Sequence, residues 1–119
     1  MNIRSFQDLQ VWQKGHSLVL EVYRKTKDFP GEERFGLVSQ IRRSAASVCA
    51  NIAEGGKKST KEFLRFLEIA DGSLEETKYH LILSRDLGYI DLESYGNLEN
   101  LCNEIGRMLN ALIRSLRSN

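Results

Sequence analysis

The sequence has little of several features that mark common protein classes. Its two cysteines, Cys49 and Cys102, lie far apart and form no CxxC pair, so neither a disulfide framework nor a zinc site is indicated. No apolar run approaches the roughly 20 residues that a membrane-spanning helix requires. The first residues also lack the apolar stretch of a secretory signal. We therefore expect a cytoplasmic protein with no membrane association.

Charge of one sign is also lacking. Seventeen Lys and Arg oppose sixteen Asp and Glu, giving a net charge of +1 and a pI near 7.8. A strongly basic nucleic-acid binder would show a clear excess of Lys and Arg, so the bulk charge names no partner.

Signatures of catalysis are missing as well. The segment 56–60 lacks the glycine spacing of a phosphate-binding loop, and there is no Gly-x-Ser-x-Gly elbow. His16 and His80 fall in different predicted helices, without the carboxylate pattern of a di-iron bundle. We expect no enzymatic activity, no metal and no cofactor. An active site assembled between subunits around one of these histidines is the alternative.

What the sequence does have is helical periodicity. Apolar and small residues repeat at alternating steps of three and four, the spacing of helices packed along a bundle seam. The pattern covers three segments: Leu37, Ile41, Ala45, Val48 and Ile52; Phe63, Leu67, Ala70, Leu74, Thr77, Leu81 and Ser84; and Leu98, Cys102, Ile105, Leu109, Leu112 and Leu116. A further helix precedes these three, with Arg24, Lys25 and Lys27 at its predicted end. The sequence thus predicts an all-α fold.

Short joints separate these helices. Pro30 suits the first position of the second helix, and the glycines at 55 and 56 end it. Ser59 begins a capping box for the third helix, Gly88 closes it, and Asp91 is the predicted N-cap of the fourth. Because short joints between long helices force antiparallel neighbours, we predict one domain over residues 1–119, an antiparallel up-down-up-down four-helix bundle.

Two helices are apolar or small on a second face. The second helix has alanines opposite its apolar stripe. The first helix carries two stripes: Leu9, Trp12, His16, Val19 and Tyr23 form one, and Val11, Leu18 and Val22 form the other. Small residues let another helix approach closely, so we predict an oligomer. An alanine-rich solvent face is the alternative. The predicted subunit interface consists of Val11, Leu18, Val22, Ala46, Ala50 and Ala53.

Charge is unevenly distributed along the chain. Residues 1–60 carry ten basic and six acidic residues, whereas residues 61–119 carry seven and ten. Residues 86–104 hold five acids and no base, which would repel phosphate or complement a basic face of a neighbouring subunit. The basic residues predict phosphate contacts, although a solvated helix face would look the same. The candidate nucleic-acid-binding residues are Arg42, Arg43, Lys57, Lys58, Lys61, Arg65, Arg107, Arg114 and Arg117.

Several longer runs carry a family resemblance. FQDLQVWQK at 6–14, QIRRSAASVCANIAEG at 40–55, EFLRFL at 62–67, GSLEE at 72–76 and LGYI at 87–90 resemble four-helix-bundle proteins encoded in intervening sequences of bacterial 23S rRNA genes, also labelled S23 ribosomal proteins. The resemblance implies a homopentamer that binds RNA or DNA and has no enzymatic activity. That family is similar to the accessory protein of diversity-generating retroelements, which implies a pentameric barrel contacting nucleic acid and a reverse transcriptase.

One position departs from the family. Cys49 stands where the family commonly has proline, so the second helix is expected to be straighter, with its hydrogen bond restored. Arg42 and Arg43 match the family motif, and they either touch phosphate or pair with Glu54 or another subunit's acid. Two hypotheses of function follow: a nucleic-acid-binding oligomer, or a scaffold whose second faces bind a partner protein.

Overall fold

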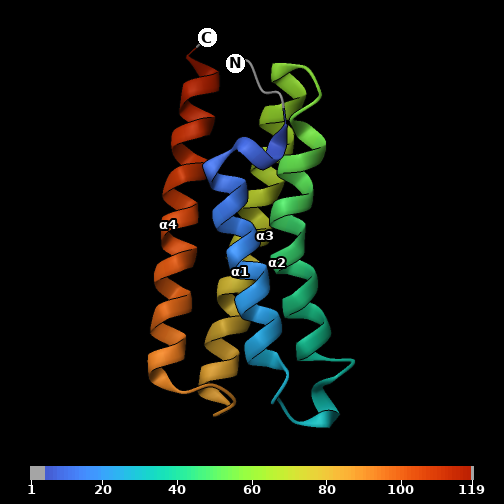
Figure 1. The fold of residues 1–119 in the computed structure, drawn as a ribbon, viewed down its shortest axis with the longest axis vertical. Coiled ribbons are helices and arrows are strands. Elements are labelled where there is room, and N and C mark those ends of the chain that lie inside the picture. The colour runs from blue at the N-terminus through green and yellow to red at the C-terminus, as the bar shows by residue number, and fades with distance from the viewer. Residues whose placement is uncertain (1–4, 119) are drawn as a thin grey trace.

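The computed structural model describes residues 5–118, which form four α-helices, two short 3-10 helices and no strand. In chain order they are η1 (Phe6–Asp8), α1 (Gln10–Thr26), η2 (Gly31–Glu33), α2 (Leu37–Gly55), α3 (Thr60–Asp86) and α4 (Leu92–Arg117). The helices lie side by side in a body of 46 × 24 × 20 Å (Figure 1). The α2–α3 joint and the end of α4 lie at one end, called here the upper end, and η2 lies at the lower end (Figure 1). None of the described helices combines the length and apolar character needed to cross a membrane.

The predicted stripes of α2 and α3 form the core. Every residue of those two stripes is buried, and α4 contributes its own stripe to the same cluster. The one difference is in the last turns of α4, where Ile113 is buried and Leu112 only half-buried. The periodicity therefore identified the inner faces of three helices correctly.

The first helix was assigned the wrong inner face. Val11, Leu18 and Val22, predicted to lie in a subunit interface, are between 0% and 5% exposed and belong to the core of this chain. His16 is exposed, and Trp12 is half-buried and packs against the edge of this core. The reason is that α1 is apolar on both sides, so which side faces inward is decided by α2 and α4 and not by its own periodicity.

The predicted N-termini of α3 and α4 and the predicted C-terminus of α3 are confirmed. The Ser59 hydroxyl accepts a hydrogen bond from the Glu62 amide (3.3 Å), and the Asp91 carboxylate accepts one from the Ser94 amide (2.6 Å). Gly88 takes a φ of +77°, which ends α3 in a left-handed turn that glycine adopts without strain.

The start of α2 differs from the prediction. Pro30 precedes the short helix η2, and α2 begins at Leu37 after a non-helical Gly36 with φ −108° and ψ −112°. The Glu33 carboxylate accepts the Leu37 amide hydrogen at 3.3 Å, and so caps a helix that has no capping side chain at Gly36 itself. Phe29, Leu37 and Val38 bury a small second cluster under this turn.

Candidate nucleic-acid interface

The nine predicted nucleic-acid contacts do not form one patch. Arg42 and Arg43 lie in the lower half of α2, whereas Lys57, Lys58, Lys61 and Arg65 lie around the α2–α3 joint at the upper end. At a rise of about 1.5 Å per residue, roughly 22 Å of helix separates Arg42 from Lys57. Arg107, Arg114 and Arg117 occupy the second half of α4 and are exposed. The structure therefore divides the predicted contacts between two ends of the bundle.

Arg42 is fixed against α1. Its Nε donates to the Thr26 hydroxyl at 2.9 Å, and a terminal nitrogen donates to the Tyr23 carbonyl oxygen at 3.4 Å. The guanidinium also lies 4.4 Å from the centre of the Tyr23 ring, within the range of a cation–π contact. Arg42 therefore ties α2 to α1 and holds the tyrosine ring in place, while part of the side chain stays accessible.

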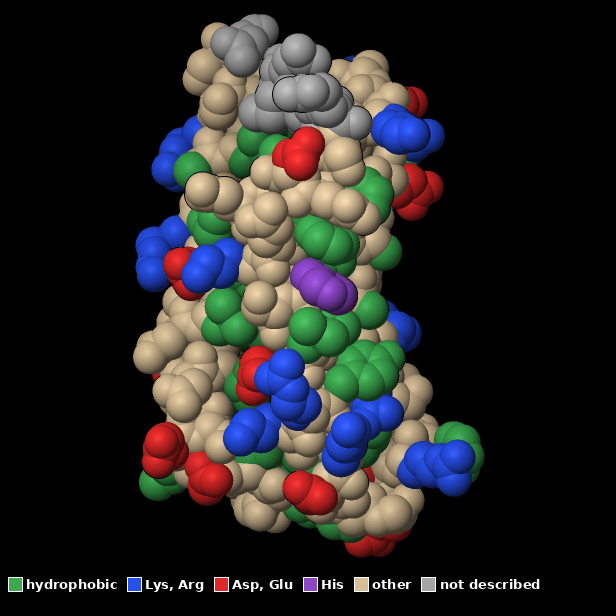
Figure 2. Space-filling view, in the orientation of Figure 1, with side chains coloured by type: hydrophobic (Ala, Val, Ile, Leu, Met, Phe, Trp, Pro, Cys, Tyr) green, Lys and Arg blue, Asp and Glu red, His purple; other side chains and the backbone are tan. Residues whose placement is uncertain are grey.

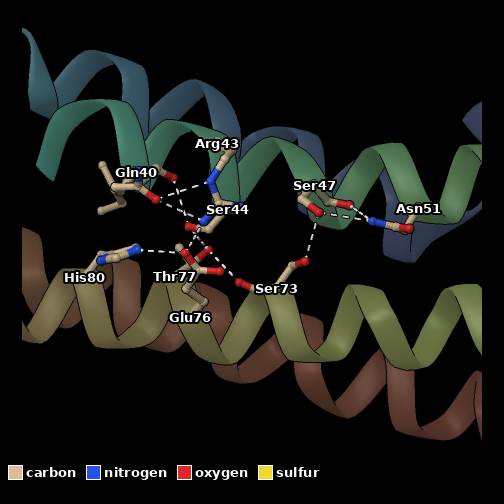
Figure 3. A network of polar contacts seen from close by, with 10 residues as sticks. Gln40, Arg43, Ser44, Ser47, Asn51, Ser73, Glu76, Thr77 and His80 are labelled. Carbon is tan, nitrogen blue, oxygen red and sulfur yellow. Dashed lines mark hydrogen bonds and ion pairs between the residues drawn. The ribbon is translucent and has the colours of Figure 1, made fainter. Parts of the chain in front are cut away.

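Arg43 belongs to a polar network between α2 and α3 (Figure 3). It donates to the Gln40 side-chain oxygen and forms an ion pair with Glu76, not with Glu54 as one alternative held. The Glu76 carboxylate also accepts a hydrogen bond from His80, one turn further along α3, at 3.0 Å. The hydrogen bond from His80, together with the charge of Arg43, lowers the pKa of the Glu76 carboxyl.

Both cysteines and part of the His80 ring are buried, whereas His16 is exposed. The buried His80 Nδ1 has no hydrogen-bond partner among the described residues, and His16 stacks on Trp12 with ring centres 5.1 Å apart. Both cysteines are buried, and burial raises the pKa of the Cys49 and Cys102 thiols to about 12. Over residues 5–118, no three His, Cys, Asp or Glu side chains are grouped to hold a metal ion.

A hollow at the lower end brings arginines and aromatic rings together. We call it the arginine–aromatic hollow; it is shallow, has a volume of about 440 Å³, and is lined by Tyr23, Arg34, Phe35, Val38, Ser39, Arg42, Arg43 and Ala46. Its lining contains three arginines and, among the described residues, no Asp or Glu. In Figure 2, Lys and Arg side chains lie over the lower half of the visible face, with Asp and Glu side chains among them and along its lower edge.

Three residues of this hollow were missed in the sequence analysis: Tyr23, Arg34 and Phe35. Phe35 is 86% exposed, and the Arg34 guanidinium lies 5.3 Å from the centre of its ring. The available signal was an aromatic residue directly after an arginine in a segment with no helical periodicity. A phenylalanine there cannot be explained as part of a helix stripe.

The upper end has a different character. Lys58 and Arg65 lie 6.0 and 4.9 Å from the ring centre of Phe66, but that ring is buried. Arg117 forms an ion pair with Glu68 across α3 and α4. Among these three basic side chains only Arg117 has an acidic partner, and the aromatic ring beside Lys58 and Arg65 is not exposed.

Comparison with protein families gives a clear assignment. The family model described as 23S rRNA-intervening sequence protein matches residues 7–111. The chain belongs to this family. A member of the S23 ribosomal protein family from Bacteroides thetaiotaomicron VPI-5482, a crystal structure of a protein with unknown function, has 30% sequence identity and a TM-score of 0.78. The match covers 87% of this chain and 97% of that one. Comparison with curated proteins gave no match.

Membership of the 23S rRNA-intervening sequence protein family confirms the resemblance seen in the sequence runs. The TM-score of 0.78 shows that the crystal structure from this family has a fold similar to the four helices of this chain. The family description names the gene context and the related structure has no known function, so the biochemical role has to be argued from this chain's own surface.

Proposed function

We propose that this chain is a non-enzymatic, homo-oligomeric up-down-up-down bundle that binds nucleic acid through the arginine–aromatic hollow. The observation that carries the proposal is the position of Arg34, Arg42 and Arg43 around one open hollow whose lining lacks carboxylates. Arginine donates hydrogen bonds in a planar fork that matches phosphate oxygens. Within the described part of the chain, no Asp or Glu lines the hollow itself, so phosphate competes with one neighbouring carboxylate only, that of Glu76, which pairs with Arg43 from α3.

The upper end of the bundle contributes fewer nucleic-acid contacts in this proposal. Arg117 is ion-paired with Glu68 just as Arg43 is with Glu76, but at the upper end Lys58 and Arg65 lie over a buried ring and not over an exposed one. Roughly 22 Å of helix separates Lys57 from Arg42, so a short nucleic acid seated in the hollow does not reach the α2–α3 joint of the same subunit. We therefore assign the main contacts to the lower end.

A salt titration tests the proposal. Affinity for labelled RNA and DNA is measured by fluorescence anisotropy at increasing salt for the wild type and for the double variant Arg34→Gln, Arg43→Gln. Each lost phosphate contact reduces the slope of log affinity against log salt by about 0.7 to 0.9, so two lost contacts reduce it by about 1.4 to 1.8. The matched control is Lys57→Gln with Lys58→Gln, which removes the same charge at the upper end.

Two results would contradict the proposal. If the wild type binds neither RNA nor DNA at low salt, the nucleic-acid function is wrong. If both double variants lose the same affinity and slope, binding depends on overall charge and not on the hollow.

We also propose that the bundle self-associates through the outer face of α1 and α2. Three of the predicted interface residues, Ala46, Ala50 and Ala53, are exposed or half-buried on α2. The Cys49 thiol donates to the Trp12 carbonyl oxygen at 3.7 Å, which places the Trp12 turn next to these alanines. A half-buried tryptophan stacked on the exposed His16 beside a row of small residues is suited to contact with another helix. A homopentamer is the expected assembly, and a partner protein is the alternative occupant of this face.

A further inference from the structure

Phe35 has an unusual position for a large apolar side chain. It lies between η2 and α2, in neither helix, with 86% of its surface exposed. A second exposed ring, that of Tyr23, lines the same hollow. Two aromatic rings that face water at one site are available to a ligand rather than to the core.

The backbone on either side of Phe35 is firmly held. The Gly36 amide donates to the Glu33 carbonyl oxygen at 3.1 Å. The Glu33 carboxylate accepts hydrogen bonds from the Leu37 amide at 3.3 Å and from the Tyr89 hydroxyl at 2.9 Å. The turn is thereby attached both to α2 and to the α3–α4 joint. Phe35 is consequently presented from a fixed backbone, which limits the entropy that a ligand must overcome on binding.

An arginine guanidinium group lies beside each of the two exposed aromatic rings. The Arg34 guanidinium lies 5.3 Å from the Phe35 ring centre, and the Arg42 guanidinium lies 4.4 Å from that of Tyr23. Guanidinium planes and aromatic rings are the two protein surfaces on which unstacked nucleobases stack. The arginines can in addition hold the phosphates next to the stacked base.

We infer that the arginine–aromatic hollow binds unpaired nucleotides of a single strand, with a base stacked on the Phe35 ring. In a duplex the base faces are covered by neighbouring pairs, so only phosphates and groove edges reach the protein. Arginines alone would serve a duplex equally well, whereas an exposed ring gains contact area only from a base that is out of the stack. This inference rests on the proposed nucleic-acid function and adds the class of strand.

A protein partner fits the hollow less well. An amphipathic peptide helix needs a groove of exposed aliphatic side chains. In this lining Val38 is buried and Ala46 is half-buried and small, so the exposed apolar surface comes mainly from the two rings. A flat base between an aromatic ring and a guanidinium covers more of the exposed ring surface than a peptide helix would.

Binding of defined strands to Phe35 variants tests the inference. The probes are fluorescein-labelled RNA and DNA single strands of about 12 nucleotides, within the range of single-strand sites, and an RNA duplex of equal length. Anisotropy titrations at one fixed salt concentration compare the wild type with Phe35→Leu and Phe35→Trp. The matched control is Tyr79→Leu, which removes another exposed ring, 58% exposed, from α3.

We expect the single strands to bind more tightly than the duplex. Phe35→Leu should weaken single-strand binding by about 5- to 150-fold, the effect of losing one stacked base, and leave duplex binding unchanged. Phe35→Trp should restore it, and Tyr79→Leu should have no effect. The RNA and DNA strands together show whether the site distinguishes the sugar. Because Phe35 is so exposed, its variants should unfold at the wild-type urea concentration, which serves as the folding control.

Each other outcome overturns the inference. Equal binding of strand and duplex with no effect of Phe35→Leu would leave nucleic-acid binding intact and assign the ring to a protein contact. A change in particle mass caused by Phe35→Leu would assign it to a subunit interface. No binding of any probe by the wild type would overturn both this inference and the proposed function.

Discussion

At the scale of single residues, Gly55 determines how closely α2 and α3 approach at the upper end. A Cβ at this buried position would lie 2.6 Å from the Phe66 Cβ and 2.9 Å from the Phe63 Cδ1. The Phe66 Cβ cannot rotate away, because it is attached directly to the backbone of α3. We therefore expect Gly55→Ala to destabilise the fold by about 1–3 kcal/mol through overpacking, more than the ~0.5–1 kcal/mol that alanine gains in a helix.

Gly72 provides the matched control for this prediction. It is exposed in the middle of α3, and a Cβ there would meet nothing within 4 Å. Gly72→Ala should stabilise the protein by about 0.5–1 kcal/mol. Urea unfolding measures the change in the free energy of unfolding for both variants. If Gly55→Ala stabilised the protein as Gly72→Ala is expected to, the close approach at Gly55 would have no energetic weight.

The two cysteines should be inert in the folded protein. Burial raises the pKa of each thiol to about 12, so at a pH of about 8 only about one thiol in ten thousand is ionised. We expect no reaction with Ellman's reagent over minutes in native buffer and two equivalents after addition of denaturant. Because the reactive thiolate forms on deprotonation, reactivity should increase as the pH rises towards 12. Rapid native labelling of a Cys49→Ser variant would show that Cys102 is accessible and the prediction wrong.

Residue roles were the part least predictable from sequence. The arginines at 42 and 43 are adjacent and look equivalent in the chain, yet one is bound to Thr26 and Tyr23 and the other to Gln40 and Glu76. Their partners lie up to 33 residues away, so the choice between phosphate contact and structural contact depends on how the helices are packed.

At the scale of the helices, α2 and α3 share a seam that contains hydroxyl groups as well as apolar side chains. The Thr77 hydroxyl donates to the Ser44 hydroxyl at 2.8 Å, and both residues are fully buried (Figure 3). One turn away, the Ser47 and Ser73 hydroxyls lie 2.9 Å apart. Small hydroxyl side chains let the two helices approach closely while their polar atoms remain paired.

The Ser44–Thr77 pair allows a double-mutant test of this seam. Thr77→Val keeps the shape but removes the Ser44 partner, and we expect a loss of about 1–2 kcal/mol, since Ser44 still donates to the Ile41 carbonyl oxygen at 3.2 Å. Combining it with Ser44→Ala removes both groups, and the double variant should be less destabilised than the sum of the single ones. Urea unfolding of the four proteins gives the coupling. Strict additivity would show that the two hydroxyls do not interact.

Helix patterns were predictable to different degrees. In α3 the apolar stripe is narrow and bordered by charge, so the sequence alone identifies its inner face. In α1 two stripes compete, and the sequence favours the one with the larger aromatic residues as the inner face, whereas the buried residues are Val11, Leu18 and Val22. The outward stripe begins with Trp12, whose ring contacts Phe6 and His16 along the outside of the bundle. The sequence also predicts too early a start for α2. The Glu33 side chain caps this helix from outside it, and that contact is not visible in the helical periodicity.

At the scale of the whole molecule, the described bundle leaves one face of small residues and one hollow of arginines on neighbouring parts of α2. Ala46 belongs to both, since it lines the hollow and lies in the alanine row. An assembly built on the alanine row would repeat the hollow in every subunit, and a strand that reached two hollows would be bound with higher effective affinity. Self-association and nucleic-acid binding are therefore expected to be coupled.

Ala50→Glu tests this coupling. Ala50 is exposed on α2 and does not line the hollow, so a glutamate there should leave the single chain folded while placing a charge in the proposed subunit contact. We expect light scattering to show an oligomer for the wild type and a monomer for the variant. The variant should also bind single-stranded RNA about 100-fold more weakly or worse, as effective concentration is lost. Ala111→Glu, an equivalent change at an exposed position of α4, should alter neither mass nor affinity. A monomeric wild type would refute the assembly outright, whereas an oligomeric Ala50→Glu variant would place the contact on another face.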